Sequence, residues 1–178
     1  TKATIGATGN GAATLSGAER NGGILIALRP TCTVPSAPSQ PTAFTLGTPT
    51  SNSLPASFTG TASGYLVIQS LTNTLPAQPA NGTTYSAANI SSLGSGLTFV
   101  QSSNATSIPG TGLAGNTRYY YFIFAYNSSA CSGGPIYSTA SPLSGNGLTC
   151  PNIPNSVTIN GLSSTGFTVD WATPTGGS

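Results

Sequence analysis

Residues 113–127 read Leu-Ala-Gly-Asn-Thr-Arg-Tyr-Tyr-Tyr-Phe-Ile-Phe-Ala-Tyr-Asn, and the fold class follows from this stretch. From Tyr119 to Phe124 every residue is aromatic or β-branched, which is typical of a β-strand. Another dense strand-forming run, Gly23–Leu28, is also bounded by turn residues. The sequence therefore predicts an all-β chain of short strands, although Ser, Thr, Asn, Gly and Pro dominate the rest of it.

The chain has 178 residues, of which four are basic and two acidic, and it has no histidine. The charged residues are Lys2, Glu19, Arg20, Arg29, Arg118 and Asp170. General acid–base pairs and carboxylate metal cages need several titratable groups in one cleft, which two distant carboxylates cannot supply. Nucleic-acid binding needs clustered basic residues, and here they are scattered. We therefore expect no enzymatic activity, no metal or cofactor and no nucleic-acid partner.

The low charge also bears on where the protein works. A surface almost without charge gives little repulsion between copies, which suits a tethered, glycosylated or assembled protein. The alternative is that hydroxyl and amide groups alone keep the chain soluble. No apolar stretch approaches the roughly 20 residues of a membrane helix, and the first residues lack the apolar core of a signal peptide. We expect any targeting signal to lie outside this chain.

An internal repeat organises the chain. Pro41-Thr-Ala-Phe-Thr-Leu46 aligns with Pro154-Asn-Ser-Val-Thr-Ile159, so the repeat offset is 154 − 41 = 113. The register continues without a gap, so that Phe58 falls on Trp171. In each copy apolar and polar residues alternate, which predicts two strands with one buried face. The second copy holds at most two strands, and two strands cannot close a sandwich.

These segments resemble the fibronectin type III family. Leu113, Thr117 four residues later and Tyr119 match the family's signature before its sixth strand, called strand F. The resemblance extends to Gly64–Val67 as strand C and to Phe167–Trp171 as strand B with its core Trp. It implies an all-β, immunoglobulin-like (fibronectin type III-like) β-sandwich.

One position of the complete copy departs from the family pattern, because Phe58 occupies the Trp position. Phe still fills a core, so only the packing there should differ. A long insertion in mid-domain and the segment Cys131–Tyr137 make this variant similar to domains repeated in large secreted proteins of Bacteroidota. The resemblance covers about Pro35 to Leu148, plus the partial copy after Cys150.

The resulting domain organisation has four parts. Residues 1–31 do not match the repeat and are expected to be the C-terminal strands of a preceding β domain. Residues 32–40 form a Pro-rich, semi-rigid linker. Residues 41–148 form the fibronectin type III-like domain, and residues 151–178 are the first strands of a second one.

Three cysteines leave one unpaired within the chain. Cys32, Cys131 and Cys150 form no CxxC pair, and no histidine is present, so a zinc site is not expected. The resemblance places the start of strand A and the loop after strand F at the same pole of the sandwich. It therefore implies a Cys32–Cys131 disulfide, with Cys150 free in this chain. A Cys131–Cys150 disulfide is the alternative.

The register of the family puts Tyr119, Tyr121, Ile123 and Ala125 in the core. A candidate interaction face then points outward from strands F and C, formed by Tyr120, Phe122, Phe124, Tyr126, Leu66 and Ile68. An apolar row of this kind marks an interaction surface or is covered by other parts of the chain. The insertion at about Leu71–Leu97 is the candidate cover. The alternative is contact with a neighbouring domain, a subunit or a glycan.

Two functions remain open at this point. The first is a non-catalytic structural or adhesive module of a long repetitive secreted or cell-surface protein, for which assembly into filaments is one form. Its partners would be neighbouring domains or copies of the same protein, glycans or other cell-surface components. The second is an accessory, glycan-binding region of a secreted hydrolase whose catalytic domain lies outside this chain. Both imply an extracellular location, and fold alone does not choose between them.

Overall fold

The computed structural model describes residues 33–128 and 134–172. The chain divides into two compact units, Thr1–Thr33 and Val34–Ser178, and all the described strands lie in the second. The strands expected within residues 1–31 lie outside the described residues. Within the described ranges, no helix is long and apolar enough to cross a membrane.

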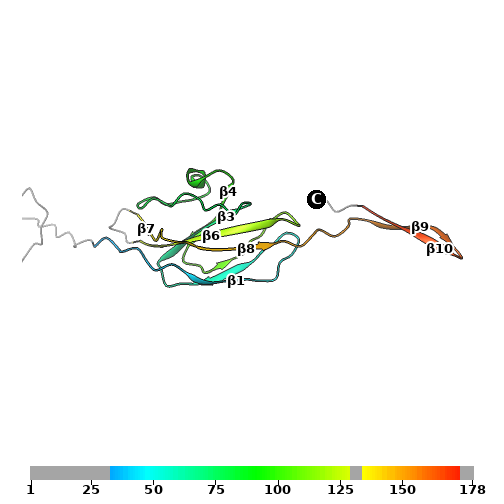
Figure 1. Ribbon diagram of the computed structural model, residues 1–178, viewed down its shortest axis with the longest axis horizontal. Coiled ribbons are helices and arrows are strands. Elements are labelled where there is room, and N and C mark those ends of the chain that lie inside the picture. Colours follow the sequence, from blue (N-terminus) through cyan, green and yellow to red (C-terminus); the bar gives the residue numbers. More distant parts are fainter. Residues whose placement is uncertain (1–32, 129–133, 173–178) are drawn as a thin grey trace, which may run out of the picture. The chain divides into compact units, whose positions relative to one another are not determined.

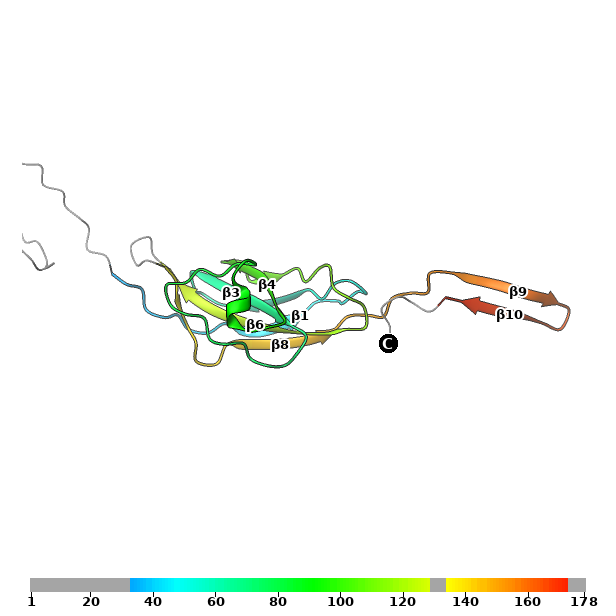
Figure 2. The ribbon, with the colours of Figure 1, turned by 90° about the horizontal axis from the view of Figure 1, so that it is seen from above.

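Two antiparallel sheets form the sandwich (Figures 1 and 2). The first has the strand order β1 (Thr42–Leu46), β2 (Ala56–Thr59), β5 (Ser107–Ile108). The second comprises β4 (Leu97–Ser103), β3 (Gly64–Ser70) and β6 (Arg118–Asn127), with β7 (Ile136–Tyr137) and β8 (Leu143–Leu148) both pairing with β6. A short 3-10 helix, η1 (Ile90–Leu93), lies in the connection between β3 and β4. These sheets confirm the all-β, fibronectin type III-like fold class predicted from the sequence.

The inner core lies between the two sheets, and alternate residues of β6 supply one side of it. Tyr119, Tyr121, Ile123 and Ala125 are buried there, as successive side chains of a strand point to opposite faces. The other buried members are Leu54, Ala56, Phe58, Tyr65, Val67 and Ile108. Phe58, at the position where the family has Trp, packs edge-on against Tyr65 with ring centroids 4.9 Å apart.

Two tyrosine hydroxyls connect this core to the backbone. The Tyr121 hydroxyl donates to the Leu54 carbonyl at 3.0 Å and accepts from the Gln69 side-chain amide at 3.1 Å, so it links both sheets. The Tyr119 hydroxyl accepts from the Ala114 N–H at 2.9 Å, which fixes the turn before β6. A tyrosine near the start of strand F that bonds a few residues upstream is a feature of immunoglobulin-like sandwiches.

Strand β8 contacts the core through Leu143 at its start and through two glycines further along. A Cβ atom at Gly145 would lie 2.2 Å from the Phe44 ring, and one at Gly147 would lie 2.8 Å from a Leu54 methyl group. The side chains of the first sheet therefore occupy the space that β8 leaves open, and this side of the core has no room for larger groups.

A separate hairpin follows the sandwich, formed by β9 (Val157–Ser163) and β10 (Gly166–Trp171). Every residue of both strands is exposed. Its assignment to a second fibronectin type III-like domain stays a prediction.

Replacing Leu54 with Ala tests the inner core. Leu54 is completely buried between the sheets, so Leu54→Ala should lower the free energy of unfolding by about 2–5 kcal/mol through lost apolar contact and a residual cavity. Leu46→Ala is the matched control, since Leu46 is 38% exposed, and it should cost less than half as much. Urea denaturation followed by circular dichroism measures both, and equal losses would contradict the core assignment.

Candidate functional site

The outward face of β6 and β3 gathers the six predicted side chains into one cluster. Leu66 pairs across the strands with Phe124, and Ile68 pairs with Phe122. Tyr120 and Tyr126 pack against this cluster from the two ends of β6. The structure therefore brings all six residues together.

The cluster is closed to solvent, so the outward row is covered by other parts of the chain and is not an open interaction face. Leu66, Ile68 and Phe124 are fully buried, and Phe122 is 3% exposed. Side chains from the insertion and from β7 cover them: Tyr85, Ile90, Leu93 and Tyr137. Covering this face removes a large apolar area from water, at about 25 cal/mol per Å², which is the physical reason for the closure. Only Tyr120 and Tyr126 remain partly exposed.

Tyr137 is the centre of the cover. Its hydroxyl donates to the Thr83 carbonyl at 3.0 Å, and its N–H donates to the Asn81 side-chain oxygen at 2.8 Å. Its ring lies edge-on to Tyr126 and Tyr85, at centroid distances of 5.4 and 6.0 Å. Burial raises the pKa of the Tyr137 hydroxyl, and the neighbouring Tyr126 and Tyr85 hydroxyls raise it further. No sequence pattern pointed to Tyr137, because its partners Thr83 and Asn81 are distant along the chain.

An uncharged groove opens where β3 ends. A cavity of about 500 Å³ is lined by residues from Ser70 to Ala77 and from Leu93 to Leu97. An adjoining hollow of about 340 Å³ shares Ser70, Leu71 and Gly96 and adds Gln69, Thr98 and Tyr119, among others. The lining side chains are hydroxyls, an amide and apolar groups. The groove can therefore offer neutral hydrogen bonds and apolar contacts.

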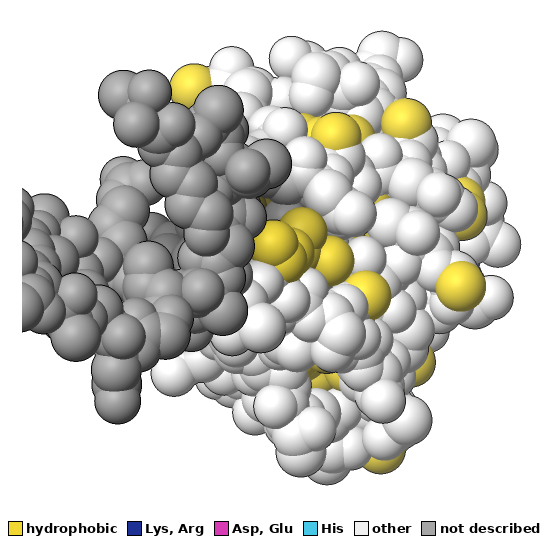
Figure 3. Space-filling view, turned by 90° about the vertical axis from the view of Figure 1, so that its left-hand side faces the viewer, with side chains coloured by type: hydrophobic (Ala, Val, Ile, Leu, Met, Phe, Trp, Pro, Cys, Tyr) yellow, Lys and Arg dark blue, Asp and Glu magenta, His cyan; other side chains and the backbone are white. Residues whose placement is uncertain are grey.

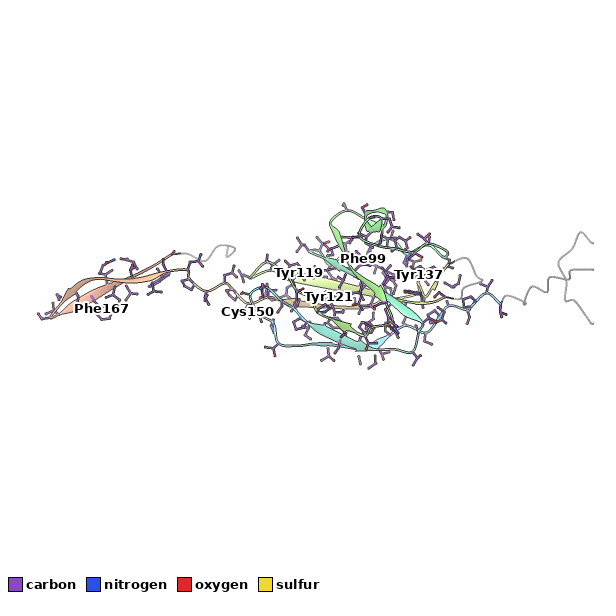
Figure 4. The ribbon with its side chains drawn as sticks, turned by 180° about the vertical axis from the view of Figure 1, so that it is seen from behind. Phe99, Tyr119, Tyr121, Tyr137, Cys150 and Phe167 are labelled. Atoms are coloured by element: carbon purple, nitrogen blue, oxygen red, sulfur yellow. The ribbon has the colours of Figure 1, made fainter. Side chains whose placement is uncertain are left out.

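Its aromatic group is poorly placed to bind a sugar. Tyr119 is 8% exposed, its ring belongs to the inner core, and its hydroxyl already accepts from Ala114 (Figure 4). Stacking on a sugar needs an accessible ring face. The groove thus gives the glycan-binding alternative only weak support.

Side chains that are charged at neutral pH are almost absent from the sandwich. Arg118 is the one charged residue between positions 34 and 148, and its guanidinium donates to the Asn146 side chain at 2.7 Å. The end of the sandwich seen in Figure 3 shows no charged side chain among its described residues. In the described ranges, no three His, Cys, Asp or Glu residues gather into a group that could hold a metal ion.

The chain enters and leaves the sandwich at opposite ends of β6. At the Asn127 end, the Asn127 side chain donates to the Ser36 carbonyl at 3.1 Å. At the Arg118 end, Leu148 pairs with Arg118, and the Cys150 N–H donates to the Thr50 carbonyl at 2.9 Å. The length of β6 separates these ends by about 30 Å, at roughly 3.3 Å for each step along a strand.

The cysteines follow this arrangement. Cys32 and Cys131 lie outside the described residues, so their pairing stays a prediction, but the segments that flank them meet at Ser36 and Asn127. Cys150, at the other end, is exposed and free within the described part of the chain. Its Sγ lies 3.4 Å from the Pro49 carbonyl oxygen, with which it forms a weak hydrogen bond.

No family model matches the chain, and no curated protein matches it either. Among solved structures, the fn3 domain of human collagen alpha-1(XX) chain is 22% identical, covering 70% of this chain and 97% of its own, with a TM-score of 0.43. The fibronectin type-III domain of human fibronectin type III domain containing protein 3 is 16% identical, covering 67% and 93%, with a TM-score of 0.41. A computationally redesigned β-sandwich protein is 21% identical, covering 63% and 90%, with a TM-score of 0.42.

The first prediction from this site concerns pH. Between positions 34 and 148 there is no Asp, Glu or His, so the thermal midpoint of the sandwich should stay constant from about pH 3 to pH 9. Burial raises the pKa of Tyr121 and Tyr137, so the unfolded state loses these protons first, at about pH 10. Stability is therefore fully present below about pH 10 and falls as pH rises above it.

Circular dichroism melts across this pH range measure the effect. Tyr137→Phe should flatten the alkaline decline, because it removes one of the two hydroxyls whose pKa burial raises. A fall of the midpoint in acid would show that a carboxylate elsewhere in the chain supports the sandwich.

The second prediction concerns the cover. Tyr137→Phe deletes the hydrogen bond to Thr83 and should lower the free energy of unfolding by about 1 kcal/mol. It should also speed amide hydrogen exchange in the segment around residues 80–90. Tyr120→Phe is the matched control, since Tyr120 lies on the same face and is partly exposed, and it should change both measurements little. Equal effects would show that the hydroxyl of Tyr137 does not hold the insertion.

Proposed function

We propose that this chain is a non-catalytic structural or adhesive segment of a long repetitive protein that is secreted or carried at the cell surface. The observation that carries the proposal is the duplication of one hairpin, in which Pro154 repeats Pro41 and the strand register matches. Leu46 pairs with Ala56 in the first copy, and Ile159 pairs with Val169 in the second. Repeating one domain along a chain lengthens the protein, which suits a structural role better than a catalytic one.

The positions of the entry and exit support a serial arrangement. Because the chain enters near Asn127 and leaves near Arg118, neighbouring domains would attach at opposite ends of the sandwich. Hydrogen bonds of Cys150 to Thr50 and Asn116 hold the exit segment against the sandwich. A Cys32–Cys131 disulfide would hold the entry segment in the same way. Domains held at both ends suit a stiff, protease-resistant stalk.

The nearly uncharged surface supports contact between copies. Like charges keep most soluble proteins apart, and the sandwich has one charged residue. Hydroxyl and amide groups dominate the exposed positions, so contacts between copies would rest on neutral hydrogen bonds and apolar patches. Assembly into filaments is the form of this role that we favour. An extracellular location follows from the proposed disulfide and from the resemblance to repeated domains of secreted Bacteroidota proteins.

The accessory glycan-binding role in a secreted hydrolase has one observation in its favour, the uncharged groove beside Ser70 and Leu71. Isothermal titration with neutral oligosaccharides would detect such binding. Saturable binding lost in Thr98→Ala, at an exposed residue of the lining, would favour this role over the structural one.

Self-association tests the structural role. Sedimentation of the full chain at rising concentration should show species larger than the monomer. Their abundance should change little between about 0.05 and 1 M salt, because screening acts on charges and the sandwich has almost none. The double variant Phe167→Ser, Trp171→Ser should associate equally, as it alters only the hairpin. Monodisperse monomers that bind no partner would contradict the proposal.

Peptide mapping without reduction tests the disulfide. Protein prepared under oxidising conditions should give a Cys32–Cys131 linked peptide and an alkylated Cys150. Cys150→Ser should leave the link intact, whereas Cys131→Ser should abolish it and cost about 2–4 kcal/mol of stability. A Cys131–Cys150 peptide would refute the assignment. Such a link would also have to span most of the roughly 30 Å length of β6, since Cys150 sits at the Arg118 end.

A further inference from the structure

The β9–β10 hairpin presents a complete apolar face to solvent. Val157 and Ile159 on β9 and Phe167 and Trp171 on β10 are each more than 60% exposed, and Val169 is 37% exposed. Patches of this kind mark surfaces that other protein covers. An isolated two-stranded hairpin is at best marginally stable in water, so this one needs a partner.

The sandwich contains the template for that partner. Moving the hairpin back by the repeat offset places Phe167 on Leu54, Val169 on Ala56 and Trp171 on Phe58. The register of the two hairpins also agrees, since Thr45 pairs with Ser57 and Thr158 with Asp170. In β2 and just before it, those three positions are at most 6% exposed, because the sheet of β3, β6 and β8 covers them.

The edge of the hairpin is open as well as its face. In the sandwich, the outer edge of β2 pairs with β5 through Ala56 to Ile108 and Ser57 to Ser107. The equivalent edge of β10, at Val169 and Asp170, has no neighbouring strand among the described residues. The missing partner must therefore meet two requirements. It must supply a strand equivalent to β5 at the edge of β10, and a sheet equivalent to β6 and β8 over the apolar face.

A second copy of this chain does not meet that specification. Its β6–β8 face is already covered by its own β1 and β2, and Gly145 and Gly147 lie closely against Phe44 and Leu54.

We propose that the β9–β10 face docks the remaining strands of its own repeat, carried on the same polypeptide, with Trp171 buried at the centre. The occupant is an antiparallel sheet with the apolar pattern of β3, β5, β6 and β8. This inference shares the repeat with the proposed function but needs no assembly or adhesion. If the docking experiment fails, the proposed function is still tested independently by self-association at different salt concentrations and by the Cys32–Cys131 disulfide.

The test supplies the missing strands from the sequence itself. The repeat offset takes Gly64 to Gly177, so residues 1–177 are followed by a second copy of residues 65–148. Cys131→Ser in the appended copy excludes a new disulfide. Trp171 is the single Trp of the chain and is 64% exposed, so its fluorescence reports on this face alone (Phe167 on the same face is labelled in Figure 4).

In the extended chain, Trp171 emission should shift to shorter wavelength, and its quenching by acrylamide should fall several-fold. Amide hydrogen exchange across residues 157–171 should also slow, because the appended strands would cover the hairpin and pair with its edge. The control carries Ile123→Asp in the appended copy only, which places a charge in the new core and should restore the quenching of the unextended chain. Because Phe167 is larger than the Leu54 that first-repeat strands accommodate, the extended chain is also made with Phe167→Leu.

Protection of Trp171 in either extended chain supports the inference. Full exposure in both would overturn it. Protection in the unextended chain that rises with concentration, together with a dimer mass, would also overturn it, because the occupant would then be a second copy.

Discussion

Strand β6 must be covered on both of its faces, and the rest of the sandwich depends on this constraint. Its residues from Tyr119 to Ala125 are almost uniformly aromatic or aliphatic, so neither side can face water without a large cost. One side is covered by β1, β2 and β5, as in an ordinary two-sheet sandwich. The other side is covered by the insertion between β3 and β4 and by β7. A third layer of irregular chain thus replaces what would otherwise be the open face of the second sheet.

Tyrosine hydroxyls make many of the buried polar contacts in this nearly uncharged protein. Tyr121 and Tyr137 each join a buried ring to a carbonyl from a distant part of the chain, and Tyr119 joins its ring to the turn before its own strand. In the described residues, no buried side-chain nitrogen or oxygen lacks a hydrogen-bond partner. Neutral hydrogen bonds of this kind fix the positions of loops without the desolvation cost of ion pairs. The protein can therefore be specific in structure while its surface stays nearly free of charge.

The candidate site shows how far strand patterns reach. Alternation along β6 correctly separated Tyr121 and Ile123 from Phe122 and Phe124, because side chains of a strand alternate between its two faces. The pattern could not show what lies over Phe122 and Phe124. Their cover depends on Tyr85 and Tyr137, whose own neighbourhoods are loops with no periodic signal. The insertion expected as the candidate cover does supply Tyr85, Ile90 and Leu93, so the outer face of β6 forms a second core.

The sequence by itself determined the two hairpins, strands β3 and β6, the two faces of β6 and the duplication that relates Pro41 to Pro154, because these are local or periodic properties of the chain. Composition also determined that no Asp, Glu or His lies between positions 34 and 148. Only the tertiary structure decided that the outer aromatic row is closed and that the β9–β10 face is open. Both depend on contacts between residues far apart in sequence. Such contacts form only when the folded chain brings a particular segment against a particular face, which no local pattern encodes.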